Sequence, residues 1–406
     1  MTSQNEKLLI LDVGRHNHLA GPDFFNAKIH INEQLWAGNV EVHVNASDWF
    51  IHGHEKDPNY ENVILHVVWT DDIEIKRRDN TLIPTLALKG YISDALLNNY
   101  QKLFNKSGLK FINCENDIST IDPFVFNNWF TRLYIERLEE KSILIQDLLV
   151  ASKNDWEKVL FILLLKNFGS KINGASFLSL AQAVDFPIIR KLKSRMQFES
   201  LLMGMVGLLE DDSIKEPYYT ELKKEYHYLK QKHSLNAIGV LSPDFFKLRP
   251  TNFPTIRLSQ FAGLYTVQPN LFHKILNTKN TEDYYEIFNI ASSEFWDNHF
   301  TFARKSKKSK KKLSKRFIDL LLINTLVPLR FYHAKHMGRN DNEAIIDIIQ
   351  GLKVEENSII SRFKALGVPI VSSKDSQAVL QLYNKYCIKN KCLQCAVGSS
   401  LLSGNI

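Results

Sequence analysis

A carboxylate and an imidazole occupy alternate positions in one short stretch near the start of the chain. The segment GNVEVHVN (38–45) alternates polar residues with valines, and its polar positions include Glu41 and His43. Side chains of a β-strand point to opposite faces in turn, so Glu41 and His43 share one face. A carboxylate beside an imidazole can bind a divalent cation or move a proton during hydrolysis.

A second carboxylate precedes this strand. Asp23 follows a Gly-Pro corner in AGPDFFNAKI (20–29), at the mouth of the preceding predicted strand. Two strands joined by a tight turn can bring Asp23 and Glu41 to one hard cation, such as Mg²⁺ or Mn²⁺. His43 would then orient water, accept a proton or add a nitrogen ligand. We therefore expect Asp23, Glu41 and His43 to form a catalytic metal site.

Three further histidines lie close by in the sequence. His52 and His54 belong to WFIHGHEKDP, and His66 lies inside the apolar segment VILHVVW. If their imidazoles reach the ion, they favour Mn²⁺ or Zn²⁺ over Mg²⁺. Two simpler interpretations remain open: the polar row is the solvated face of an amphipathic strand, and His66 is a core residue bonded to backbone.

Hydrophobic periodicity divides the chain into a strand-rich region and a helical region. Period-two or continuous apolar runs predict strands in the first ninety or so residues, and a period near 3.6 predicts helices from about residue 118 onward. The predicted strands are 7–14, 23–32, 34–44, 63–72 and 82–90, with a short helix within 46–62 and another helix over 93–104. The prediction is an α+β protein, with a small mixed-sheet domain over 1–110 and an all-helical domain over 111–406.

The motif residues resemble the core of PD-(D/E)XK nucleases. In that core a Pro-Asp precedes one strand and Asp/Glu-X-Lys lies on the next, as Pro22-Asp23 and Glu41-Val42-His43 do here. The resemblance implies that Asp23 and Glu41 hold the metal. His43 stands at the position of the lysine that steers the attacking water, and Lys28 is the alternative candidate for that role. The usual leading helix is not found, because few residues precede the first strand.

The whole chain also resembles a bacterial family of uncharacterised conserved proteins. The segments that carry this resemblance are GPDF, GNVEVHV, DW, HGH and LHVV, all in the N-terminal region. It implies no particular activity.

The cysteines suggest a second metal site. Cys387, Cys392 and Cys395 follow C-x4-C-x2-C spacing near the C-terminus, and Cys114 is the remaining cysteine. Four thiolates suit tetrahedral Zn²⁺ or a [4Fe–4S] cluster, with Cys114 as the fourth ligand. The alternative is that the three clustered cysteines are small buried apolar residues of a last helix.

Positive charge is concentrated in one segment. The net charge is +7, and nine Lys or Arg residues lie between Arg304 and Arg316. Such a run is either a solvated loop or helix start, or a contact for nucleic-acid phosphates. Arg249 and Arg257 either bind phosphates or stabilise a rigid connection between helices. The predicted nucleic-acid-binding residues are Lys307, Lys308, Lys310, Lys311, Arg249 and Arg257.

These patterns favour a metal-dependent nuclease acting on DNA or RNA. The alternatives are an inactive module of the same shape that binds nucleic acid or protein, and a purely structural protein. No Gly-rich phosphate loop or serine-hydrolase elbow is present. The apolar runs are too short to span a bilayer, no signal peptide is evident and four cysteines make no disulfide scaffold, so we expect a cytoplasmic protein.

Overall fold

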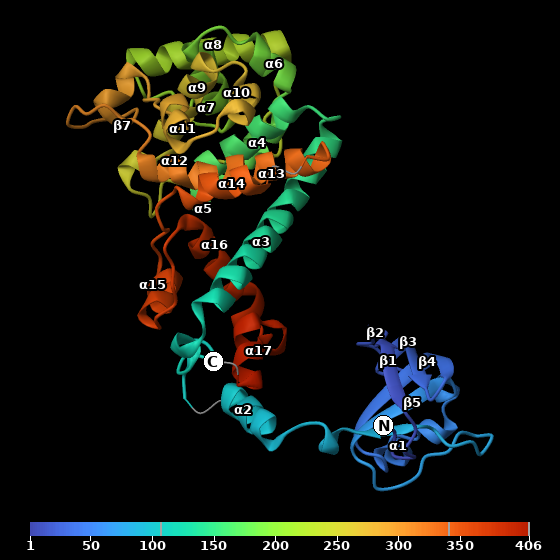
Figure 1. Cartoon of the computed structure of the whole chain (residues 1–406). Helices are drawn as coiled ribbons and strands as arrows, with labels where there is room; N and C mark the ends of the chain where they lie inside the picture. Colours follow the sequence, from blue (N-terminus) through green and yellow to red (C-terminus); the bar gives the residue numbers. More distant parts are fainter. Residues whose placement is uncertain (106–107, 340–341, 405–406) are drawn as a thin grey trace. The chain divides into compact units, whose positions relative to one another are not determined.

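The computed structural model of the chain describes residues 1–105, 108–339 and 342–404. The chain divides into two compact units. The first comprises Met1–Cys114 with Gly398–Ile406, and the second comprises Glu115–Val397. Figure 1 shows strands gathered in the N-terminal part of the chain and helices through most of the remainder.

A six-stranded mixed sheet forms the body of the first unit (Figure 1). It is ordered β1-β3-β4-β5-β6, and β2 also pairs with β3. The β1–β3 and β3–β4 pairs are antiparallel, whereas β4–β5 and β5–β6 are parallel. The strands are β1 (Leu8–Asp12), β2 (Arg15–His16), β3 (Phe24–Ile31), β4 (Gln34–Asn45), β5 (Val63–Thr70) and β6 (Thr85–Ala87).

Local sequence explains how β3, β4 and β5 are connected. The β3–β4 hairpin turns at Asn32, whose φ of 54° is left-handed and is tolerated by asparagine. The parallel β4–β5 pair needs a crossover, which residues 46–62 supply. This crossover contains the helix α1 (Asp48–Ile51) and two 3₁₀ turns, η1 (His54–Lys56) and η2 (Pro58–Tyr60).

Two apolar clusters pack around the sheet. On β5, Ile64 and Leu65 belong to one cluster, and Val63 and Val68 belong to the other. The second cluster includes Trp49 and Tyr60 from the crossover. The crossover therefore covers one face of β4 and β5.

The second unit is mainly helical (Figure 1). Its helices are α3 (Pro123–Ala151), α4 (Trp156–Phe168), α5 (Ser170–Ala183), α6 (Phe186–Lys191), α7 (Arg195–Met205), α8 (Pro217–His233), α9 (Pro254–Val267), α10 (Leu271–Asn277), α11 (Thr281–Ile287), α12 (Lys315–Leu321), α13 (Val327–His336), α14 (Asn342–Gln350), α15 (Ser358–Ala365) and α16 (Ser373–Leu382). The long helix α3 packs against α16, where Arg137 Nε donates to Gln377 Oε1 at 2.8 Å.

The remaining elements are short. In the first unit, α2 (Asp94–Phe104) contacts α17 (Ala396–Ser403) through a hydrogen bond from Asn99 Nδ2 to the carbonyl oxygen of Leu402. In the second unit, β7 (His299–Thr301) pairs with β8 (Arg304–Lys305). Among the described residues, no helix combines the length and apolar composition that a membrane span requires.

The predicted α+β class, a mixed sheet followed by a large helical region, is confirmed. Of the predicted strands, the one over 63–72 forms β5 inside the sheet, and the one over 82–90 forms β6 at its edge. The second region was predicted to be entirely helical, and this is wrong at the β7–β8 hairpin. This hairpin is too short for its residues to establish a two-residue period.

Candidate functional site

The polar face of β4 is buried rather than solvated. Glu41 is only 5% exposed, whereas Val44 on the opposite face is 64% exposed. This arrangement arises because the β4–β5 crossover folds over the polar face. The interpretation of Glu41 and His43 as an ordinary wet surface is therefore wrong.

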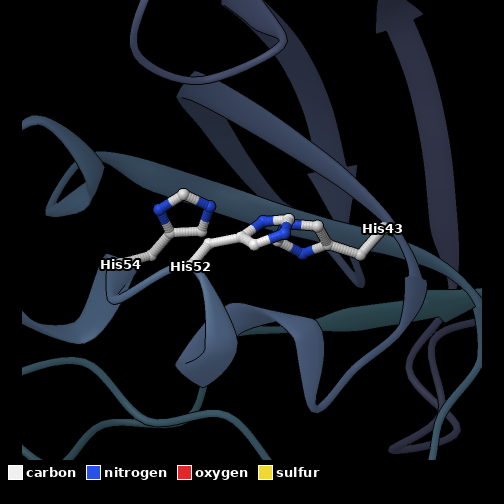
Figure 2. A group of neighbouring side chains, drawn as sticks. All are labelled: His43, His52 and His54. Atoms are coloured by element: carbon white, nitrogen blue, oxygen red, sulfur yellow. The ribbon is translucent and has the colours of Figure 1, made fainter.

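Three histidines converge under the crossover, and Glu41 contacts two of them. Oε1 of Glu41 lies 3.4 Å from Nε2 of His43 and 3.3 Å from Nε2 of His54. Nε2 of His43 also lies 3.0 Å from Nδ1 of His52. One ring nitrogen from each of the three histidines falls within 4.8 Å of the others (Figure 2). His52 and His54 of the HGH segment, which the sequence placed near the predicted strand, therefore lie beside His43.

The crossover places these two histidines by a tight turn. His52 follows the last residue of α1, and His54 begins η1. Gly53 between them has φ 72°, which glycine adopts without the steric cost that other residues carry. The turn presents both rings to β4, with His52 exposed and His54 half-buried. The site therefore opens to solvent on the His52 side.

Aromatic residues of the crossover enclose the inner part of the site. Tyr60 stacks on His54 with ring centroids 3.7 Å apart. Trp49 meets the rings of His54 and His66 edge-on, at 5.3 and 5.4 Å. The sequence reasoning did not name Trp49 or Tyr60 as site residues, although both lie in the polar segment between the two predicted strands. They restrict solvent and hold the imidazoles in fixed orientations.

His66 supports His43 from the neighbouring strand. It is fully buried on β5, and its Nε2 lies 2.8 Å from Nδ1 of His43. From the sequence, His66 could be either a metal ligand or a core residue bonded to backbone. In the structure its partner is an imidazole, so it belongs to the site as a support for His43.

Asp23 contacts Glu41 from the start of β3. Its backbone N–H donates to Oε2 of Glu41 at 3.2 Å, and its carboxylate Oδ2 accepts a hydrogen bond from the backbone N–H of Val42 at 3.0 Å. The predicted trio of Asp23, Glu41 and His43 is therefore brought together. Asp23 turns Oε1 of Glu41 toward the histidines, because Oε2 is held by its N–H.

The enclosure shifts the proton affinities of the site. Burial raises the pKa of Glu41 to about 7, and the nearby carboxylate of Asp23 acts in the same direction. Burial lowers the pKa of His43 and of His66 to about 4, with smaller effects from neighbouring imidazoles. Neutral histidines offer the nitrogen lone pairs that metals bind.

The distances fit a bound divalent ion. Two ligands that each lie about 2.1 Å from one ion are about 3.0 Å apart at a right angle and about 3.4 Å apart at the tetrahedral angle. The three ligand distances of 3.0, 3.3 and 3.4 Å fall in this range. The 3.0 Å contact is also a hydrogen bond, whereas the buried Nε2 of His54 has no hydrogen-bond partner among the described residues.

Lys28 does not share this cluster. It is exposed on β3 and pairs with Ala37, four residues before Glu41 on β4. Of the two candidates for the lysine position of the resemblance, His43 is the one that contacts Glu41.

The cysteines do not assemble a comparable set of ligands. Cys387 ends a π-helical turn, Cys392 begins a 3₁₀ turn and Cys395 is buried after it. Cys114 belongs to the first unit and the other three to the second. Within the described part of the chain, ligand atoms converge in groups of three or more at His43, His52 and His54 and not at cysteines. The predicted zinc or iron–sulfur cluster therefore has no geometric support.

The predicted nucleic-acid-binding residues fall into two groups. Arg249, Lys307, Lys308 and Lys310 are exposed. Lys311 is buried, and its amine donates to the carbonyl oxygens of Asp297 and Ser309. Arg257 is also buried, with hydrogen bonds to Gln260 and Asn252.

Comparison with known proteins gives the family. No curated protein and no solved structure matches the chain. The family model DUF2851, described as "Protein of unknown function", matches residues 1–358. Because this match covers most of its length, the chain belongs to the DUF2851 family.

Proposed function

We propose that the first unit carries a divalent-metal centre that hydrolyses phosphodiester bonds in DNA or RNA. The observation that carries this proposal is the spacing of Glu41 Oε1 from Nε2 of both His43 and His54, at 3.4 and 3.3 Å. Glu41, His43, His52 and His54 would hold the ion. A nitrogen-rich set of this kind suits Zn²⁺ or Mn²⁺ better than Mg²⁺.

The residues around the ion have distinct tasks. A divalent ion in such a site supplies an activated water and offsets the charge that develops on a phosphodiester. Asp23 orients Glu41 through its backbone N–H. His66 orients the ring of His43, and Trp49 and Tyr60 restrict water on the inner side. His52 lines the open side, where a polymer strand can approach.

Three features support nucleic acid as the substrate. Pro22-Asp23 and Glu41-Val42-His43 resemble the nuclease motif, and the backbone N–H of Asp23 contacts the carboxylate of Glu41. The second unit exposes Lys307, Lys308 and Lys310 within the basic segment. Clustered lysines attract a phosphate backbone by releasing its counterions.

The test combines metal content with cleavage. The full chain is purified, loaded with Zn²⁺ or Mn²⁺, and incubated with plasmid, single-stranded DNA or RNA. We expect about one ion per chain and metal-dependent cleavage. Glu41→Gln and His43→Ala are expected to abolish both, because each removes a buried ligand. His18→Ala is the matched control, since His18 is an exposed histidine of the same unit. Cleavage that persists in both ligand variants would exclude this site.

One observation favours a second candidate, an inactive module stabilised by a structural metal. The side chains of Glu41, His43 and His54 are only 7, 5 and 10% exposed. Four protein ligands also complete a tetrahedral zinc site and leave no open position. Stoichiometric Zn²⁺ with no cleavage of any polymer, and with salt-sensitive binding of nucleic acid, would favour this candidate.

A further inference from the structure

A cavity of about 400 Å³ lies in the second unit, away from the histidines. It is bounded by the start of α7, the C-terminal half of α9, the segment after α11 and part of the basic segment. The residues that matter below are Arg195, Gly263, Ser292, Asp297 and Lys310. Together with Glu294, they bring two basic, two acidic and one hydroxyl side chain to one space.

Arg195 is held rigidly at one side of the cavity. Its Nε donates to Glu199 Oε1 at 3.0 Å, and its Nη2 donates to the carbonyl oxygens of Ser259 and Ala291 at 2.9 and 2.7 Å. Its Nη1 makes no hydrogen bond within the described residues. The guanidinium is thus fixed by two of its nitrogens, and the third remains available to a ligand.

The local sequence makes room for this arrangement. Glu199 is fully buried, and it also accepts hydrogen bonds from Ser259 Oγ and Tyr218. A Cβ at position 263 would lie 3.0 Å from both Cζ and Nη2 of Arg195. Glycine at this position therefore lets the guanidinium pack against α9.

Two other residues of the lining each carry a buried polar atom that lacks a hydrogen-bond partner. Ser292 is 5% exposed, and its hydroxyl has no hydrogen-bond partner among the described residues. The same holds for the buried Oδ1 of Asp297. An unsatisfied buried polar atom costs free energy, so a ligand that bonds to it gains that energy back.

Lys310 reaches the cavity on a well-anchored segment. On either side of it, the Ser309 N–H donates to the carbonyl oxygen of Asp297, and the Lys311 carbonyl oxygen accepts from the Ser292 N–H. The buried amine of Lys311 adds bonds to the carbonyl oxygens of Asp297 and Ser309. Main-chain bonds therefore tie this part of the basic segment to the cavity wall, and the side chain of Lys310 is exposed.

We propose that this cavity binds a sugar phosphate. Arg195 Nη1 and Lys310 would hold the phosphate, because a fixed guanidinium with a neighbouring ammonium suits a compact dianion. Asp297 Oδ1 would accept a hydrogen bond from a sugar hydroxyl, and Ser292 would exchange one with the ligand. A simple anion would leave the Asp297 carboxylate unsatisfied, so the hydroxyl-bearing ester fits better. This site is independent of the metal centre.

The experiment is calorimetric titration of the full chain with ribose 5-phosphate and glucose 6-phosphate, beside ribose and succinate. We expect one site per chain for at least one sugar phosphate, and no binding of ribose or succinate. Lys310→Ala and Ser292→Ala are each expected to weaken binding about 10-fold or more. Lys308→Ala is the matched control, because Lys308 is exposed in the same segment and is not among the residues that line the cavity.

Thermal unfolding separates a ligand role from a structural one. Ser292→Ala removes an unsatisfied hydroxyl, so the unliganded variant is expected to be at least as stable as the wild type. Failure of both sugar phosphates to bind would overturn the proposal. So would equal affinities in the wild type, Lys310→Ala and Ser292→Ala, or succinate binding as tightly as the sugar phosphates.

Discussion

Nδ1 of His43 lies 2.8 Å from Nε2 of His66, across the parallel strands β4 and β5. This contact determines which nitrogen of His43 faces Glu41. When Nδ1 carries the proton and donates it to His66, Nε2 keeps its lone pair toward Glu41, His52 and any ion between them. Metal-bound histidines usually donate their second ring N–H in this way, so His66 fixes both the tautomer and the orientation of His43.

His66→Gln is expected to lower metal affinity by about 10- to 100-fold without changing the number of ions bound at saturation. The reason is that His66 supports a ligand and is not itself a ligand. Competition with a chromophoric chelator measures the affinity, and His30→Gln, on β3, is the control. Complete loss of the site at saturating metal would make His66 a ligand, and unchanged affinity would remove it from the site.

Removing the metal is expected to lower stability. A ligand that binds only the folded chain adds about 2.7 kcal/mol when its free concentration is 100 times its Kd. Urea unfolding of the Zn²⁺-loaded protein is therefore expected to begin at lower urea after EDTA treatment. Glu41→Gln supplies the control, because EDTA should leave its unfolding curve unchanged. An EDTA effect of equal size in that variant would place the stabilising ion elsewhere.

In the metal-free protein, Glu41 is expected to make a pH-dependent contribution to the free energy of unfolding. Its pKa is 4.5 when unfolded and about 7 when folded, so the folded state holds the proton more tightly between these values. The contribution is therefore fully present below pH 4.5 and is lost as the pH rises to about 7. The shift corresponds to roughly 3 kcal/mol.

Glu41→Gln isolates this contribution, because glutamine does not titrate. Urea unfolding in the presence of EDTA gives the free energy of unfolding of each protein. The wild-type value minus the variant value should fall by that amount between pH 4.5 and 7. His43 and His66 act in the opposite direction, since their lowered pKa values make stability fall as the pH drops from 6.5 toward 4. They remain in both proteins, so the difference reports mainly the titration of Glu41. A difference that stays flat or rises with pH would contradict the buried state of Glu41.

The sequence predicted the elements of the sheet better than their burial. Alternation over 38–45 predicted a strand, and β4 contains it. Alternation defines two faces but does not say which face another segment will cover. The answer depends on Trp49 and Tyr60, which the crossover brings to the sheet. This is why Glu41 is buried while Val44 is exposed.

The candidate site could be predicted in part for the same reason. Glu41 and His43 are neighbours on one strand face, so local periodicity was enough to pair them. His52 and His54 join them through a turn at Gly53, and spacing alone does not determine that turn. The Glu199–Arg195 cluster was not predicted at all. Its members come from α7, α8, α9 and the segment after α11, and no short-range pattern links residues so far apart.

Glu199 is expected to be among the residues on which the second unit depends most for stability. Glu199→Gln would leave the Arg195 guanidinium without its buried counter-charge and would place an amide among donors from Tyr218, Ser259 and Ser293. Removing one member of a buried ion pair costs roughly 3–5 kcal/mol. Glu139→Gln is the matched control, because its contact with Lys335 is exposed and should cost less than about 1 kcal/mol. Urea unfolding followed by tryptophan fluorescence measures both, and equal losses in the two variants would show that the Glu199 cluster does not stabilise this unit.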